Sequence, residues 1–513
     1  NDSANSVNLI KIFDDGSFQT VTAGTSNLRL GLNAGNSIVS GAQYNTLIGD
    51  NAGTAITTGD RNVAVGFGAL QSEDANGYNV AIGYASLDSL NAGADAYNTA
   101  VGYASGNVMT TGIYNTLIGG LAGDAITDAD YNVALGYNAL STNQLGSSSV
   151  AIGSGALATQ NPASAASMLN VAVGQDAGTS ITTGSLNTLI GGLTGDSLTV
   201  GEKNVTLGYT ALGSDTKGNK STALGYAALN AQNFTSATDA FNTAVGFEAG
   251  GAITTGFSNT VVGGLALDAQ TTGDYNVALG VLALSADTTG NKATGLGYGA
   301  LAAQNVTDSA DTFNTAVGFS AGAAVTTGIE NTLIGASAGD ALTVGSNNVA
   351  LGYEALSSET AGDRSVAIGR AALQVQNNTS NADIYNIAIG YGTGESITTG
   401  IQNVLLGGVT GDALTDADYN VAVGTAALSS DTLGSRSTAL GHSTLANQNF
   451  ASDTNTFNVA VGFEAGNDIT TGVQNTLIGG EAGDSLTDAD YNVAMGVSAL
   501  GTDTLGSRAT ALG

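Results

Sequence analysis

The sequence predicts an all-β protein, a parallel β-roll or solenoid built from many short rungs. Three observations predict this class: a short aliphatic segment ending in glycine recurs along the chain, its interval is fixed, and each segment alternates as a β-strand does. The segment "YNTLIGG" at Tyr114–Gly120 returns as "LNTLIGG" at Leu186–Gly192 and as "QNTLIGG" at Gln474–Gly480. Repetition of one short unit indicates a stack of equivalent layers.

The interval between the glycines that close these segments gives the size of one rung. Most steps are 17 residues and one early step is 19; from Gly102 on, every fourth step is 21, so a longer period of 72 residues runs through the chain. Its marks are Gly102, Gly174, Gly246, Gly318, Gly390 and Gly462. From Gly49 to Gly513 there are 27 closing glycines, and rungs stacked about 4.8 Å apart would form a rod roughly 125–130 Å long.

Each rung is expected to hold two short strands and two turns. In Asn62–Gly66, Val63 and Val65 share one face and Ala64 takes the other, which is the alternation of a strand. A second short run follows the glycine, and a turn such as "TTG" or "DAD" comes next. We expect the aliphatic pair to fill a narrow interior and the glycine to permit a positive φ at the corner.

Stacking places equal positions of successive rungs above one another, so each position becomes a column. Asn lies four residues before the closing glycine in 21 of the 27 rungs. Stacked Asn amides can hydrogen-bond up and down a ladder. The predicted ladder includes Asn115, Asn132, Asn187 and Asn204.

A second column, five residues before the closing glycine, mixes aromatic and basic residues. The predicted cation–aromatic pairs are Tyr275 with Lys292, Tyr419 with Arg436, and Tyr491 with Arg508. Such a contact stabilises an exposed site by about 0.5–1 kcal/mol. Since the spacing is regular along the whole chain, we interpret the column as structural stacking rather than a binding patch.

The rungs predict one continuous repeat region over residues 27–513 that stops within a repeat at the C-terminus. Residues 1–26 fall outside the period, and "NLIKIFDDGSFQTVTAG" predicts a hairpin that caps the stack or joins it to a preceding module. The first residues show no signal peptide. No apolar stretch of about 20 residues is present, so we expect no membrane insertion.

The charge of the chain makes nucleic acid and anionic membranes poor candidate partners. The chain has 42 acidic and 11 basic residues, a formal charge of −31, and this surface repels nucleic acid and anionic membranes. Without cysteine it can form neither disulfides nor zinc fingers.

No catalytic constellation is visible, so we expect no enzyme and no cofactor. His442 is the single histidine, and its column otherwise holds Tyr, Phe and small residues, which indicates a substituted aromatic. Acidic pairs recur in every long repeat, whereas an active site is normally built once. Turn carboxylates are an alternative as calcium ligands, but lone Asp residues in turns usually accept backbone hydrogen bonds, and no metal site is predicted. The first to inspect are Asp128, Asp130, Asp416 and Asp418.

The 21-residue steps insert four residues at the same corner and are the candidate contact loops. One position within them varies most, and its occupants are Pro162, Phe234, Val306, Asn378 and Phe450. Variation in a protruding loop on a rigid scaffold can indicate recognition. The alternative is that these loops fill space between chains or relax the rung.

Rungs such as "SSVAIG" at Ser148–Gly153 and "RSVAIG" at Arg364–Gly369 resemble the head repeats of trimeric autotransporter adhesins, whose signature is close to Asn-Ser-Val-Ala-Ile-Gly. That resemblance implies a left-handed parallel β-roll that packs as a homotrimer. The family's rungs are commonly shorter, and nothing here looks like its coiled-coil stalk or membrane anchor. The run "NTLIGGLAGDALT…YNVALG…RSTALG" is also similar to long repetitive fibres of bacteriophages, especially marine ones.

These resemblances imply a non-enzymatic fibre of a phage tail or virion, a rigid spacer for host attachment. The alternative is a bacterial surface adhesin whose repeats bind a surface or receptor. Expected partners are further copies of the chain, other fibre or virion proteins, and a host cell-surface glycan or protein. The expected location is the virion, or the cell surface and its exterior.

Overall fold

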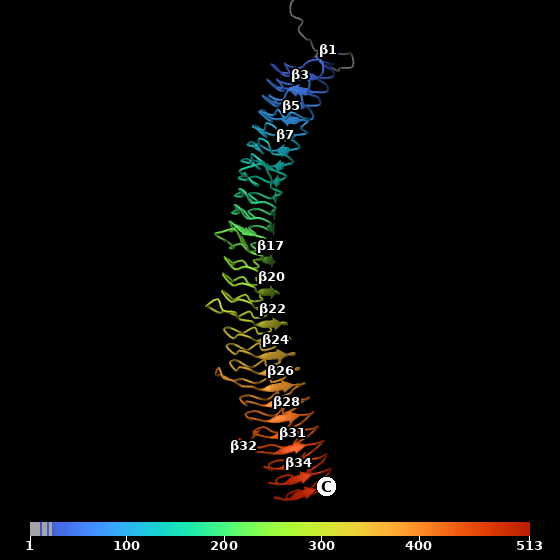
Figure 1. Cartoon of the computed structure of the whole chain (residues 1–513), viewed down its shortest axis with the longest axis vertical. Helices are drawn as coiled ribbons and strands as arrows, with labels where there is room; N and C mark the ends of the chain where they lie inside the picture. Colours follow the sequence, from blue (N-terminus) through green and yellow to red (C-terminus); the bar gives the residue numbers. More distant parts are fainter. Residues whose placement is uncertain (1–10, 13–17, 20–22) are drawn as a thin grey trace, which may run out of the picture. The chain divides into compact units, whose positions relative to one another are not determined.

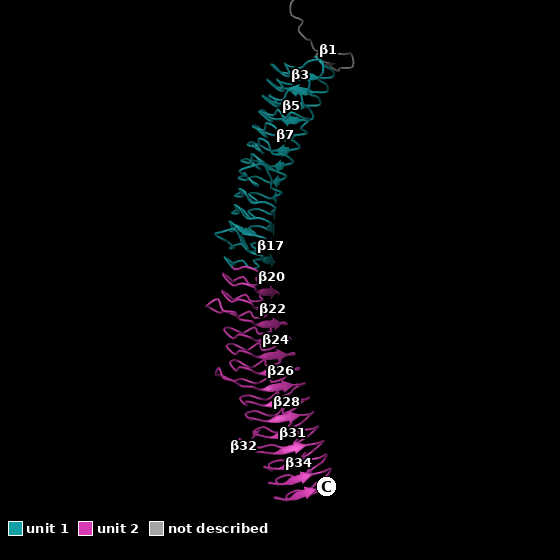
Figure 2. Cartoon of the chain, in the orientation of Figure 1, with its two compact units in different colours: residues 1–255 teal, residues 256–513 magenta. Residues whose placement is uncertain are grey.

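The computed structural model describes residues 11–12, 18–19 and 23–513, and the chain divides into two compact units, Asn1–Thr255 and Gly256–Gly513 (Figure 2). Each unit is a parallel β-solenoid in which successive turns of the chain stack along one direction (Figure 1). The described residues contain no helix, and hence no helix suited to crossing a membrane. The predicted all-β fold class is confirmed.

Three-residue strands form the ladder of each unit, with thirteen in the first and fifteen in the second among the described residues. The first ladder runs β3 (Leu28–Leu30), β4 (Thr46–Ile48), β5 (Val63–Val65), β6 (Val80–Ile82), β7 (Thr99–Val101), β8 (Thr116–Ile118), β9 (Val133–Leu135), β11 (Val150–Ile152), β13 (Val171–Val173), β14 (Thr188–Ile190), β15 (Val205–Leu207), β17 (Thr222–Leu224), β19 (Thr243–Val245). The second runs β20 (Thr260–Val262), β21 (Val277–Leu279), β22 (Thr294–Leu296), β23 (Thr315–Val317), β24 (Thr332–Ile334), β25 (Val349–Leu351), β26 (Val366–Ile368), β27 (Ile387–Ile389), β28 (Val404–Leu406), β29 (Val421–Val423), β31 (Thr438–Leu440), β33 (Val459–Val461), β34 (Thr476–Ile478), β35 (Val493–Met495), β36 (Thr510–Leu512).

The register of the ladder follows the sequence period. Val63 pairs in parallel with Val80, 17 residues on, and Val150 pairs with Val171 across a 21-residue step. The structure adds a rung that our count omits: Leu28 pairs with Thr46 over a step of 18, and the closing glycine of this rung is Gly31.

The N-terminal region contains one described pairing outside the ladder. Strand β1 (Lys11–Ile12) pairs antiparallel with β2 (Phe18–Gln19). The rest of residues 1–22 lies outside the described part of the chain, so the cap or junction role of residues 1–26 stays a prediction.

The expected second strand of each rung is wrong. The run after the closing glycine is a turn, since its residues alternate through left-handed conformations, as at Leu121 (φ 58°) and Gly123 (φ 56°). An extended strand cannot form at such dihedrals. The turns still bond from rung to rung: the Leu121 N–H donates to the Tyr103 carbonyl at 2.9 Å.

The expected direction of the aliphatic pair is also wrong. In β5 the middle residue, Ala64, is fully buried, whereas Val63 and Val65 are half-exposed and point outward. The rungs approach closely at the glycine corners: a Cβ on Gly119 (φ 135°) would collide with the Gly136 carbonyl of the next rung. Small or single aliphatic residues therefore fill the core, including Leu117, Ile126 and Leu140.

Short two-residue strands fasten the loops of the 21-residue steps. They pair in parallel with the rung before the loop, as Gly218 with Thr238 and Gly434 with Thr454. The strands are β10 (Gly146–Ser147) with β12 (Ala166–Ser167), β16 (Gly218–Asn219) with β18 (Thr238–Asp239), and β30 (Gly434–Ser435) with β32 (Thr454–Asn455). Equivalent single bridges join Asn291 to Asp311 and Asp363 to Asp383.

Candidate interaction face

The outward side of the strand ladder is the most distinctive surface of each unit. We call it the outer face and define it by four columns, at five, three and one residues before the closing glycine and one residue after it. The column directly before the glycine holds only Leu, Ile, Val or Met. These side chains remain substantially exposed, for example Leu207 at 53 % and Met495 at 46 %.

Charge is segregated around the outer face. Eight of the 11 basic residues lie in its two border columns, but only Asp50 and Glu330 of the 42 acidic residues do. The basic residues are Arg61, Lys203, Lys220, Lys292, Arg364, Arg436 and Arg508 in one border, and Arg370 in the other. A chain with a net charge of −31 therefore carries an apolar face bordered by basic residues. Charge repulsion between two copies of the chain is weakest on this side.

The cation–aromatic contacts occur as a column, although one partner differs from expectation. The Arg436 guanidinium lies 4.9 Å from the Tyr419 ring centroid, and that of Arg508 lies 5.6 Å from Tyr491. Lys292 lies over Phe313 at 5.2 Å instead of over Tyr275. Its ammonium is 2.5 Å from the Asp311 carboxylate, and this ion pair draws the side chain toward the later rung.

The opposite border, one residue after the closing glycine, is a column of stacked rings. Tyr84 lies between Phe67 and Tyr103, 5.4 Å from each, with the planes within 11°. His442 stacks on Phe463 at 5.4 Å and so occupies an aromatic position of this column, as the sequence indicates. Parallel offset rings at this separation attract each other.

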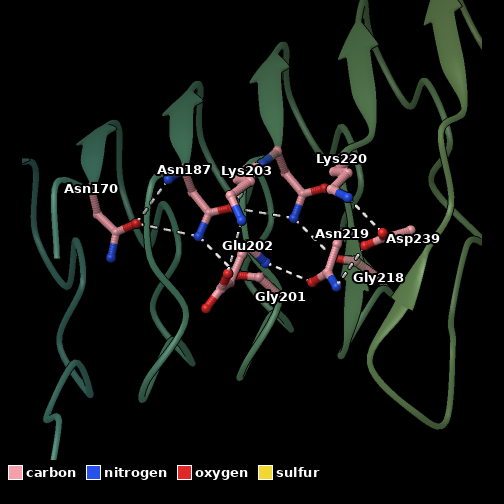
Figure 3. A network of polar contacts seen from close by, with 10 residues as sticks. Asn170, Asn187, Gly201, Glu202, Lys203, Gly218, Asn219, Lys220 and Asp239 are labelled. Carbon is pink, nitrogen blue, oxygen red and sulfur yellow. Dashed lines mark hydrogen bonds and ion pairs between the residues drawn. The ribbon is translucent and has the colours of Figure 1, made fainter.

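The Asn column forms a buried ladder on the inner side of the strands. In Figure 3 the Asn187 backbone N–H and side-chain Nδ2 both donate to Asn170 Oδ1, at 2.9 and 3.2 Å. Asn187 Nδ2 also donates to the Gly201 carbonyl at 2.9 Å. The backbone contact recurs at Asn115, Asn132 and Asn204, and the amide of each also donates to a backbone carbonyl 14 residues on. Each amide thus forms hydrogen bonds with backbone groups of two neighbouring rungs. An amide-to-amide ladder alone would leave these backbone groups without a partner.

The five variable loop positions point inward. Phe234, Val306, Asn378 and Phe450 are only 5–9 % exposed, and Pro162 is buried. They are plugs that seat the loops, so their side chains cannot meet a partner at the surface. A contact role for the exposed residues around them stays a prediction.

The turn carboxylates bond to the preceding rung. Asp128 Oδ1 accepts from Thr111 Oγ1 at 2.5 Å, and Asp130 Oδ1 accepts from the Ile113 N–H at 2.8 Å. Asp416 and Asp418 repeat both contacts. Within the described part of the chain, no group of three or more His, Asp or Glu side chains is placed to hold a metal ion.

A buried polar hub accompanies most of the 21-residue steps, and the sequence reasoning missed it. Asp215, Asp287, Glu359 and Asp431 are fully buried and stand 72 residues apart. Each accepts from a Gln one rung later, as Asp287 Oδ2 does from Gln304 Nε2 at 2.7 Å. Burial raises the pKa of the Asp287 and Asp431 carboxyls. A signal was available, since the seventh position after the glycine cycles through two apolar residues, an acid and a Gln in most repeats, with Asn143 and Gln270 as exceptions.

These features together define a repetitive, fibre-like β-solenoid whose Asn ladder bonds within one chain and whose outer face leaves aliphatic side chains exposed. Neither models of known protein families nor curated protein sequences match the chain. The strand pairing establishes the parallel solenoid of 17-residue rungs. The resemblance to adhesin heads and phage fibres stays a prediction.

Proposed function

We propose that the chain is part of a structural, non-enzymatic fibre that self-associates through the outer face. The column of Leu, Ile, Val and Met that runs along this face without interruption carries the proposal. A soluble monomer seldom leaves so long an apolar surface uncovered. A homotrimer, the state implied by the adhesin resemblance, would bury the face among three copies.

The role we assign to the fibre is that of a rigid spacer on a bacteriophage tail or virion, outside the host cell. Support comes from the uniform backbone pairing, because a repeated ladder gives length without a catalytic or ligand-binding pocket. Other fibre or virion proteins are the proposed neighbours. A host glycan or protein would be met at a tip or along the loops.

Light scattering of the chain at several concentrations tests the self-association. We expect a mass near three times 50.2 kDa that does not change on dilution. The double variant Ile334→Glu with Leu351→Glu places two charges on the outer face and should dissociate the assembly. Thr327→Glu with Val344→Glu adds the same charge at exposed turn positions and should not. A monomeric wild-type chain contradicts the proposal.

A surface adhesin whose repeats themselves bind is the second candidate, and the exposed loops at regular 72-residue intervals favour it. Binding of the purified chain to host cells separates the two candidates. A spacer shows no saturable binding. An adhesin shows binding that falls when loop residues such as Thr235, Ser236 and Asp308 are replaced by Ala.

A further inference from the structure

The two borders of the outer face differ in chemistry, and this difference favours one direction of packing between copies. The basic border, five residues before the closing glycine, holds seven of the 11 basic residues and a single acid, Glu330. The ring border, one residue after the glycine, has Tyr and Phe as its commonest kind of residue and holds one Arg, Arg370. Antiparallel copies would set the basic border against itself. Parallel copies set the basic border of one against the ring border of the next, which avoids this repulsion.

Charged groups of the basic border lean toward the rung after their own. The Lys220 ammonium lies 4.9 Å from the Phe241 ring centroid and 2.5 Å from the Asp239 carboxylate, and both partners belong to the following rung (Figure 3). Lysine or arginine pairs with a later aspartate in two further repeats, Lys292 with Asp311 and Arg364 with Asp383. Parallel copies at equal height therefore bring these cations toward the following rung of the neighbour.

The ring border offers an aromatic residue one rung on from each of the six cations that a further rung follows. These matches are Arg61 with Tyr84, Lys203 with Tyr226, Lys220 with Phe247, Lys292 with Phe319, Arg364 with Tyr391, and Arg436 with Phe463. Matching within the same rung is poorer, because it sets Arg364 against Arg370. Where Ser148 replaces the cation of its 72-residue repeat, Gln175 replaces the ring. Cation and ring are thus absent together, which indicates that they act as a pair.

The same step of one rung also matches the two borders in size. At one rung in four the ring border has only Gly or Ala, and we call these positions notches: Gly120, Gly192, Gly264, Ala336, Gly408 and Gly480. One rung earlier the basic border carries a large apolar side chain. Within either unit the pairs are Tyr97 with Gly120, Leu169 with Gly192, Phe313 with Ala336, Tyr385 with Gly408, and Phe457 with Gly480.

The fold of one chain does not require these notches. Gly408 lies outside the left-handed region, and a Cβ added to it would meet no atom within 4 Å. At Gly480 the nearest atom to an added Cβ is the Phe463 carbonyl oxygen, 4.0 Å away. Within one chain, border residues contact members of their own column, as Arg436 contacts Tyr419 and Phe457. The matches between the two borders therefore have no role until a second copy is present.

We propose, resting on the self-association above, that copies pack in parallel and that each side chain of the basic border meets the ring border of the next copy one rung beyond its own. Cations lie against rings, and large apolar side chains enter the notches. These contacts set the register between copies, which the uniform aliphatic column cannot do. A slip of one further rung would move Arg436 from Phe463 to Gly480 and Phe457 from Gly480 to Val497, so both matches would be lost together.

A photoreactive ring at position 457 of the full chain tests direction and register together. Phe457→p-benzoylphenylalanine keeps an aromatic group at this exposed position of the basic border. On irradiation we expect it to insert at or beside Gly480 of a second copy, and mass spectrometry of the cross-linked peptides locates the insertion. Assembly from a mixture of nitrogen-14 and nitrogen-15 chains separates contacts between copies from contacts within one chain.

Variants of the notch and light scattering of the same samples separate the outcomes. Gly480→Trp fills the notch and should lower the yield of this cross-link by about tenfold, whereas Gly480→Ala, which copies Ala336, should retain it. An assembled chain that cross-links at Phe463, within the basic border, in another repeat or not at all overturns the register and leaves self-association standing. A chain that is monomeric by light scattering contradicts both.

Discussion

The two sides of a single strand differ more than any two rungs of the chain. In β24, Leu333 points inward and is fully buried, while its neighbour Ile334 points outward and stays half-exposed. Inside, the Asn ladder and the glycine corners pair nearly every polar group within the chain. Outside, apolar surface remains in water. The inner side accounts for the fold of one chain, and the outer side is the surface on which the proposed self-association rests.

The largest loss of stability is expected at the closing glycines, where successive rungs approach each other most closely. Gly335 has φ 137° and abuts the Gly352 carbonyl, so Gly335→Ala strains the corner and should cost about 3–5 kcal/mol in the free energy of rung opening. Gly408 lies in open space on the outer face, and Gly408→Ala should cost little. Native-state hydrogen exchange measures both. Equal costs for the two substitutions would show that the close contact of Gly335 with the Gly352 carbonyl does not determine stability.

The comparison within β24 is sharpened by truncating its two aliphatic residues. Leu333→Ala empties a filled interior and should cost about 2–5 kcal/mol of opening free energy. Ile334→Ala should cost about 1 kcal/mol in a separated chain, because water already reaches that side chain. A cost for Ile334→Ala that rises with protein concentration would place the outer face in an interface, and one that does not would argue against it.

Removal of one ladder amide is expected to have an intermediate effect. Asn348 donates to the Gly362 carbonyl and accepts from the Ser365 N–H, both at 2.9 Å. Asn348→Ala leaves these two buried backbone groups without their partner and should cost about 1–3 kcal/mol, measured by the exchange of amides 349–352 and 365–369. Unchanged protection of both segments would mean that water replaces the amide.

The border of the outer face should contribute less. Arg436 lies over Tyr419, and the double-mutant cycle of Arg436→Ala with Tyr419→Ala should give a coupling of about 0.5–1 kcal/mol. The matched cycle of Lys292 with Tyr275 should give none, and Lys292 should couple to Phe313 instead. The reverse pattern would contradict the placement of Lys292.

The smallest effect concerns pH. Burial raises the pKa of Asp287 in the folded chain above its unfolded value, so its contribution to stability is fully present below the unfolded pKa and is lost as pH rises through the folded pKa. The free energy of unfolding of the wild-type chain, relative to Asp287→Asn, should therefore rise as pH falls from 7 toward 4. A flat difference across this range contradicts the raised pKa.

The periodic part of the fold was predictable because it depends on identity at equal intervals. Gly119 and Gly136 lie 17 residues apart, and the structure pairs the strands before them, β8 and β9, in that register. The step of 18 after Gly31 hid the first rung from the same count. Stacking interactions such as that of His442 also follow from the columns, since a column determines which side chains are neighbours.

Direction and connectivity were not predictable from the interval. The alternation at Val63–Val65 gives two faces, but it does not say which of them is buried, and in the structure Ala64 lies inside. The hub at Asp431 was missed for a related reason: acid and Gln lie 17 residues apart, and nothing local links them. Lys292 likewise lies over Phe313 rather than Tyr275 because it pairs with Asp311, 19 residues further along the chain.

The equivalence of the rungs also has a genetic consequence. A gene that encodes 72-residue units of one pattern can lose or gain a unit by unequal recombination. Within either solenoid unit, a change of this size restores the order of 17- and 21-residue steps, so the closing glycines and the Asn column stay in register. Variants of the gene that differ by whole units should therefore fold, whereas the gain or loss of a single rung at a hub would separate a carboxylate such as Asp431 from the amide of its Gln. Length is the property that such a gene can vary most freely.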